Sequence, residues 1–223
     1  MSDQFQLRRD TQANVAAATP AAGEPAYDTT RAALLIGDGA TPGGVPQALP
    51  ALFGGYLSGR YYWAGQANAS SAAVSANLLY AMPFVCLQKQ IFTKIGISVT
   101  AGASGSAHLG IYKTAAGAVP AGLVLDAGTV STTSAGAQEI TGLNFALDPG
   151  VYCLAALFNA GPTIQWCLSC DAWQMLLGMG STAPSTDIET MFEASQTYGA
   201  LPANFPTPSY VVNSSIPGVW LRL

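Results

Sequence analysis

The sequence predicts an all-β protein with a small N-terminal module followed by one antiparallel β-sandwich. Three observations predict this. Apolar side chains alternate with period two in several runs of residues 61–223, which is typical of half-buried strands. Turns containing Gly or Pro separate these runs at short intervals. Residues 1–50 differ in composition from the rest of the chain, because they contain a higher proportion of charged residues and closely spaced Gly and Pro turn motifs.

Residues 1–50 form the predicted assembly module. Short strands are expected at 5–8 and 32–36, with one Ala-rich helical turn at 12–18. A unit of this size buries little apolar surface alone and normally needs a disulfide, a metal or oligomerisation. The segment has no cysteine and no cluster of metal ligands. Oligomerisation is therefore the expected source of its stability.

Three motifs in this segment carry a family resemblance: FQLRRDTQAN at 5–14, AGEPAYD at 22–28 and LIGDGATPGGVP at 35–46. In this order and spacing they resemble the N-terminal module of phage tail fibres and of the major tropism determinant family. The resemblance implies an intertwined trimeric β-prism and a place on a virion appendage. It also assigns an assembly motif, which consists of Arg8, Arg9, Asp10, Gly37, Asp38 and Gly39.

After a glycine-rich junction at 51–60, residues 61–223 form the predicted sandwich. Ile91, Ile95, Ile97 and Val99 are expected to share one face of a strand, with Phe92 on the other. Residues 151–158 are apolar at both parities, which indicates a central strand covered on both faces. Further strands are expected around 109–111, 163–170 and 219–223. The segments GIYK at 110–113, LVLDAGTV at 123–130 and LDPGVYCLA at 147–155 resemble jelly-roll modules of phage structural proteins and carbohydrate-binding-like domains.

One helix is expected in the second half of the chain. Thr186 and Glu189 have the spacing of a capping box ahead of an apolar group, and the helix would end near Ser195.

Three groups of side chains have residue types that can carry out catalysis or bind a metal. Cys167 and Cys170 have redox or zinc-site spacing, but they fall on opposite faces of a strand and lack further ligands. His108, the single histidine, has no nucleophile elbow to accompany it. Asp187, Glu189 and Glu193 have carboxylates of the kind that cleave glycosides, but they equally suit the first turn of a helix. We therefore expect no enzyme activity, no metal and no cofactor.

Ligand binding is expected from aromatic and amide side chains instead. Aromatic rings can stack on sugar rings while amides bind hydroxyl groups. A long irregular tract at 178–217 is the expected location, since such tracts are often functional. The predicted ligand-binding residues are Trp173, Tyr198, Asn204 and Tyr210.

Charge and hydropathy restrict the partners. The net charge is −4, and no Lys or Arg lies between Lys113 and Arg222, which argues against nucleic acid. No apolar run approaches the length needed for membrane insertion. The first residues lack the features of a secretory signal. We therefore expect synthesis in the host cytoplasm and release by lysis as part of a virion.

These observations favour a tail fibre or head spike of a phage or gene-transfer-agent-like particle. The expected partners are two further copies in a homotrimer, other virion structural proteins and a host cell-surface polysaccharide. One alternative is a decoration or adaptor subunit that contacts other virion proteins and no receptor. A second alternative is a spike enzyme that degrades glycans.

Overall fold

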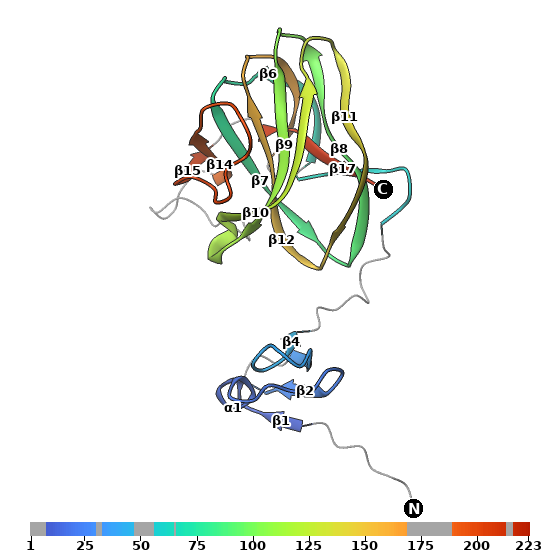
Figure 1. The fold of residues 1–223 in the computed structure, drawn as a ribbon, viewed down its shortest axis with the longest axis vertical. Helices are drawn as coiled ribbons and strands as arrows, with labels where there is room; N and C mark the ends of the chain where they lie inside the picture. The colour runs from blue at the N-terminus through green and yellow to red at the C-terminus, as the bar shows by residue number, and fades with distance from the viewer. Residues whose placement is uncertain (1–7, 30–32, 47–55, 65, 169–188, 213–215) are drawn as a thin grey trace, which may run out of the picture. The chain divides into compact units, whose positions relative to one another are not determined.

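The computed structural model describes residues 8–29, 33–46, 56–64, 66–168, 189–212 and 216–223. The chain divides into two compact units, Met1–Phe53 and Gly54–Leu223. In the described residues both units are built almost entirely from strands, as the sequence predicts (Figure 1). The expected junction covers residues 51–60, of which 51–55 lie outside the described residues.

The first unit is a four-stranded sheet with the order β1-β2-β3-β4 and one short helix. Its elements are β1 (Arg8–Asp10), α1 (Gln12–Ala16), β2 (Pro25–Asp28), β3 (Ala33–Ile36) and β4 (Val45–Pro46). The expected helical turn and the strand at 32–36 are both confirmed, whereas residues 5–7 lie outside the described residues. The buried apolar cluster of the described part of this unit consists of Val15, Ala26 and Leu35 alone.

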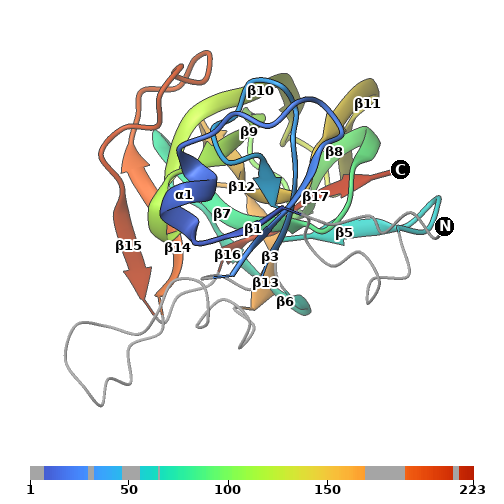
Figure 2. The same cartoon turned by 90° about the horizontal axis from the view of Figure 1, so that it is seen from below.

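The second unit contains two antiparallel sheets that pack face to face as a sandwich. The six-stranded sheet has the order β10-β9-β12-β7-β14-β15 (Figure 2). Its strands are β7 (Leu78–Cys86), β9 (Ser106–Thr114), β10 (Pro120–Ser131), β12 (Gly150–Phe158), β14 (Glu189–Ser195) and β15 (Ser209–Val212). A single turn of 3₁₀ helix, η2 (Ala116–Ala118), precedes β10.

The seven-stranded sheet has the order β16-β13-β8-β17-β5, with β11 paired to β8 and β6 paired to β13. Its strands are β5 (Tyr61–Trp63), β6 (Gln66–Ala73), β8 (Gln90–Ala101), β11 (Gly136–Leu147), β13 (Thr163–Leu168), β16 (Ile216–Pro217) and β17 (Val219–Arg222). The resemblance to jelly-roll modules stays a prediction.

The central strand β12 of the six-stranded sheet is buried on both faces. Leu154, Ala156 and Phe158 point into the main core between the sheets. The alternate residues Cys153, Ala155 and Leu157 belong to a second apolar cluster on the outer face of this sheet. Leu201 and Phe205, from the segment after β14, cover that cluster. The expectation of a central strand with two apolar faces is therefore confirmed.

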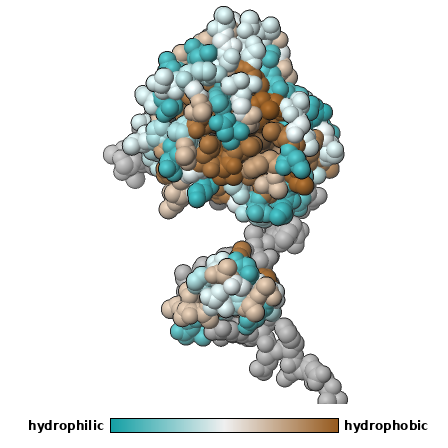
Figure 3. Space-filling model, viewed as in Figure 1, coloured by the Kyte–Doolittle hydropathy of each residue, from teal (hydrophilic) through white to brown (hydrophobic). Residues whose placement is uncertain are grey.

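The main core reaches the surface where the outer strands β10 and β11 approach each other. Apolar side chains gather on this face of the sandwich (Figure 3). The partly buried residues that pack against the core here include Leu125, Ala127, Ile140, Leu143 and Phe145.

Two expectations about strands are wrong. Residues 189–195 form a strand and no helix, because this segment pairs with β7 on one side and β15 on the other. Helix signals are a weak prior that such pairing overrides. On β8, Phe92 is buried whereas Ile91 is 49% exposed. Phe92 and Ile95 are both buried although they differ in parity, so the alternation along β8 breaks between them, beside the shift in pairing between Thr141 and Phe145 of β11.

Candidate ligand-binding cleft

A cleft of about 400 Å³ opens between the two sheets of the sandwich. We call it the inter-sheet cleft. Strands β6, β13 and β16 line it from one sheet, and β7, β14 and β15 line it from the other (Figure 2). Its lining residues are Ala72, Ala73, Val74, Ser75, Leu78, Tyr80, Ile164, Trp166, Met191, Glu193, Val211 and Pro217. Its volume lies in the range of small-molecule sites, roughly 300–1,000 Å³.

The period-two geometry of strands explains which side chains line the cleft. On β14, Met191 and Glu193 face the cleft, whereas Phe192 and Ala194 belong to the cluster on the outer face. On β13, Ile164 and Trp166 have the corresponding inward positions. A carboxylate at Glu193 therefore has a position that a core residue would normally fill.

Two aromatic side chains give the cleft flat surfaces. Trp166 is partly exposed and lies opposite Pro217 in the pairing of β13 with β16. Tyr80 is buried, and its ring makes an edge-to-face contact with Phe158 at 6.1 Å between centroids. The phenolic oxygen of Tyr80 accepts a hydrogen bond from the backbone N–H of Ser75 at 2.9 Å, which fixes the ring.

Glu193 supplies the charge of the cleft. It is partly exposed, and no side chain among the described residues donates a hydrogen bond or forms an ion pair with its carboxylate. No other lining residue is charged. The cleft therefore combines aliphatic walls, two aromatic rings and one carboxylate.

Asn77 holds the rim between β6 and β7. Its φ of 59° is left-handed, a conformation that Asn tolerates better than most residues. Its backbone N–H donates to the carbonyl of Phe158 at 2.8 Å, and its carbonyl accepts from Gln196 at 3.1 Å. Its Oδ1 accepts from the N–H of Tyr198 at 2.9 Å. These bonds connect the cleft rim to the segment that follows β14.

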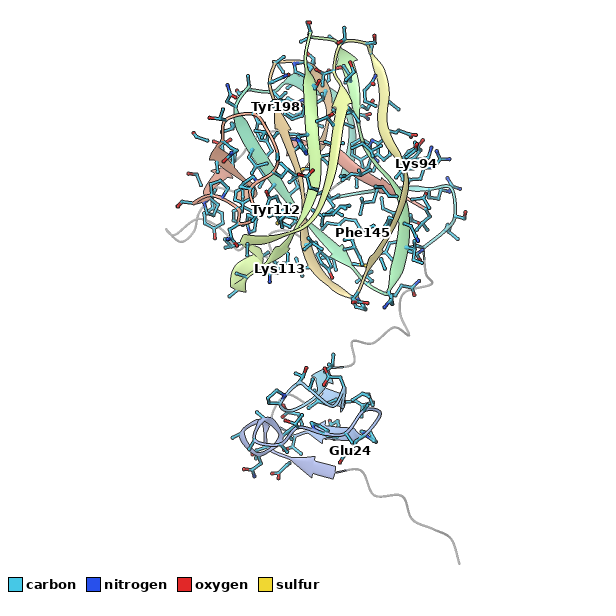
Figure 4. The ribbon with its side chains drawn as sticks, viewed as in Figure 1. Glu24, Lys94, Tyr112, Lys113, Phe145 and Tyr198 are labelled. Carbon is cyan, nitrogen blue, oxygen red and sulfur yellow. The ribbon has the colours of Figure 1, made fainter. Side chains whose placement is uncertain are left out.

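The predicted ligand-binding residues do not line the cleft. Trp173 lies outside the described residues. Tyr198 is partly buried against His108, with ring centroids 6.5 Å apart (Figure 4). Tyr210 is 47% exposed and packs on Phe192, on the outer face of the six-stranded sheet. Asn204 is exposed in the covering segment, where it bridges to Gly122 of β10.

Sequence reasoning passed over Trp166, Tyr80 and Ser75, and it weighed Glu193 only as part of a catalytic group on a helix. The signal that could have found the cleft is the parity of β14. Met191 and Glu193 share a face, so a core-facing position carries a charge.

The contacts of His108 hold neighbouring elements of the sandwich together. The Nε2 of His108 makes a hydrogen-bonding contact with the Asp126 carboxylate, which also accepts from the backbone N–H groups of Gly128 at 3.1 Å and Leu201 at 3.3 Å. The pair therefore ties β9 and β10 to the covering segment.

The cysteines offer no site within the described part of the chain. Cys86 and Cys153 are buried free thiols, and burial raises the pKa of both. Cys167 lies in β13, whereas Cys170 is outside the described residues. In the described ranges no three residues of the types His, Cys, Asp or Glu gather as they would around a metal ion.

The expected assembly motif forms a tight turn in the first unit. The Asp38 carboxylate accepts hydrogen bonds from the N–H of Ala40 at 2.9 Å and from both the N–H and the hydroxyl of Thr41. These bonds lower the pKa of Asp38 to about 2. A Cβ at Gly37 would lie 2.1 Å from the carbonyl oxygen of Ala21, and Gly39 has a φ of +78°, so the turn requires both glycines.

The remaining motif residues lie in β1. Arg8, Arg9 and Asp10 pair in parallel with β2. The Asp10 carboxylate accepts from the Thr11 N–H at 2.8 Å and from the Asn14 amide at 2.7 Å. The motif thus joins the end of β1 to α1 within one unit.

These features define a two-unit, all-β protein whose second unit is a sandwich. None of the described helices is long and apolar enough to cross a membrane. The family model of the major tropism determinant N-terminal domain matches residues 5–41. The match supports a phage tail-fibre-type structural module at the N-terminus and, with it, a virion component. It covers the segment that contains the Asp38 turn. No curated protein matches the chain.

Proposed function

We propose that this chain is a subunit of a tail fibre or head spike that attaches a phage-like particle to a polysaccharide on the host surface. The observation that carries the proposal is the combination of a tropism-type module with an aromatic-lined cleft in one chain. In the proposed assignment the first unit joins the particle, and the inter-sheet cleft of the second unit binds the glycan. The protein is made in the host cytoplasm and leaves the cell by lysis.

The cleft chemistry suits a saccharide. Trp166, which is partly exposed, supplies a ring face for the C–H-bearing face of a sugar, while the Ser75 hydroxyl and the Glu193 carboxylate can bind sugar hydroxyl groups. Mostly apolar walls with a few polar groups are typical of small-ligand sites. A single such site binds weakly, so attachment would rely on several copies.

The first unit supports the proposal of a homotrimer docked to other virion proteins. Its described core contains three residues, and Leu34 and Val45 are 40% and 42% exposed. A unit this poor in buried apolar surface gains from sharing a core with further copies. Linked sites can raise overall affinity by about 10² to 10⁴ without a new contact.

The proposed role is binding without catalysis. Glycoside hydrolysis uses two carboxylates that flank the bond. Glu193 is the one carboxylate among the described lining residues, and Asp187 lies outside the described part. The decoration or adaptor role is the outcome that remains if the protein binds no host glycan.

The experiment compares three variants of the intact protein for binding to purified host surface polysaccharide and for particle adsorption. Trp166→Ala is expected to reduce both at least tenfold. Tyr61→Ala, on β5 away from the cleft, is the aromatic control and should leave both unchanged. Loss in Tyr210→Ala with normal binding by Trp166→Ala would move the site to the outer face. Normal adsorption of particles that carry Trp166→Ala, with no glycan bound by the parent protein, would refute attachment.

A further inference from the structure

We infer that the inter-sheet cleft selects a glycan segment that carries a protonated amine and rejects acidic sugars. This inference rests on the proposed function and names the substrate class of the same site. Two observations lead to it: the cleft contains one negative charge, at Glu193, and the strands that form its walls contain no Lys or Arg.

The walls of the cleft have no cation. No Lys or Arg occurs between Arg60 and Lys89, the stretch that contains β6 and β7. None occurs between Lys113 and Arg222, the stretch that contains β13, β14, β15 and β16. An acidic sugar in this cleft would lose water contacts and gain no ion pair, which is unfavourable. The Glu193 carboxylate would in addition repel it.

A protonated amine, in contrast, finds two favourable groups. The Glu193 carboxylate can accept a charge-assisted hydrogen bond from it. The indole face of Trp166 attracts cations, and Trp is the strongest aromatic partner for them. Both residues line the same cleft, from opposite sheets. An ammonium group between them would be held by a charge on one wall and a ring on the other.

A purely structural role explains the Glu193 carboxylate less well than ligand binding does. Inward-pointing charges protect exposed edge strands from pairing with other chains. However, β14 is no edge strand, because it pairs with both β7 and β15. Within the described ranges no side chain pairs with Glu193, so none of those side chains is stabilised by its carboxylate. Ligand selection therefore accounts for the charge better than protection of an edge.

The test uses three oligosaccharides of equal length with different charge: glucosamine oligomers, N-acetylglucosamine oligomers and galacturonic acid oligomers. Binding to the intact protein is measured by calorimetry at about pH 5.5, because the amines of glucosamine oligomers are weaker bases than a Lys side chain and need mildly acidic solution to be protonated. The amine form is expected to bind about fivefold more tightly than the neutral form, which corresponds to about 1 kcal/mol for a partly exposed charge pair. The acidic form should not bind. The preference should weaken at high salt.

Two variants separate the charge from the fold. Glu193→Gln keeps the shape of the side chain, and its amide can still bind a sugar hydroxyl group. It is therefore expected to weaken amine binding more than neutral binding, so that most of the preference for the amine is lost. Asp148→Asn removes a carboxylate whose side chain is 71% exposed and which lies outside the cleft, and it should change nothing. An equal drop in both variants would overturn the inference, because it would indicate a general effect of net charge.

The remaining outcomes distinguish the inference from the proposed function. If the protein binds host polysaccharide but does not prefer the amine oligomer, the selectivity is wrong and attachment stands. Stronger binding of oligolysine than of glucosamine oligomers would overturn the assignment of a sugar amine. If no oligosaccharide and no host polysaccharide binds, the proposed function itself fails.

Discussion

Replacing Glu193 by Leu should stabilise the sandwich and abolish its selectivity for amines. Full burial of a Leu side chain contributes about 1.5–3 kcal/mol. Position 193 is partly exposed and lies beside Met191 and Val211 in the cleft, so we expect about half of this, about 1 kcal/mol. No described side chain loses a partner in the exchange.

Urea unfolding followed by tryptophan fluorescence measures the effect. All four tryptophans lie in the second unit, so the signal reports the sandwich alone. The midpoint should rise without a change in the slope of the free energy against urea. Asp148→Leu, at an exposed position, serves as the control and should shift the midpoint little. A loss of 1 kcal/mol or more in Glu193→Leu would refute the reasoning, because it would mean that the carboxylate stabilises the fold.

Three further predictions concern the turn, the rim and the covering segment. Because hydrogen bonds lower the folded-state pKa of Asp38 from its ordinary 3.8 to about 2, its contribution to the first unit is present above pH 3.8 and is lost as the pH falls toward 2. Limited proteolysis against pH should show this loss, and Asp38→Ala should flatten it. Asn77→Val should destabilise the sandwich by about 2–3 kcal/mol in urea unfolding, because it places a β-branched residue at positive φ and removes the hydrogen bond to Tyr198. Asn77→Gly loses only the hydrogen bond and should cost about 1 kcal/mol. Phe205→Ala should cost about 3 kcal/mol by the same assay, since Phe205 is 8% exposed and covers the outer cluster; a cost below 1 kcal/mol would show that the segment is held by other contacts.

The sequence predicts the fold class and most strands because burial leaves a direct mark on alternation. The segment that became β12 is apolar at both parities, and the structure buries both of its faces. The motif around Asp38 likewise predicts a turn, since the Asp38 carboxylate binds residues two and three positions further on and Gly39 has a local conformation that favours glycine. These features depend on residues close together in the sequence.

The errors concern features that depend on distant partners. Local signals at 186–195 favour a helix, but β7 and β15 supply the hydrogen bonds that make residues 189–195 a strand. The burial of Phe92 accompanies an irregularity in the pairing of β8 with its neighbour β11, which comes from a distant part of the sequence. The cleft is also invisible locally, because Trp166 and Glu193 come from different sheets and meet only when the sandwich closes.

Because this chain has few charged residues, a carboxylate at a core-facing position of the cleft is unexpected and needs an explanation. Charged residues make up 9% of the sequence, so a stretch of strand has little chance of receiving one at a core-facing position. Replacing Glu193 with an apolar residue would improve packing, and stability alone therefore does not account for the carboxylate. A residue that lowers stability without serving a neighbour is typical of a binding site. The same argument explains why Tyr210, although more exposed, is the weaker candidate: it packs on Phe192 and so has a structural role already.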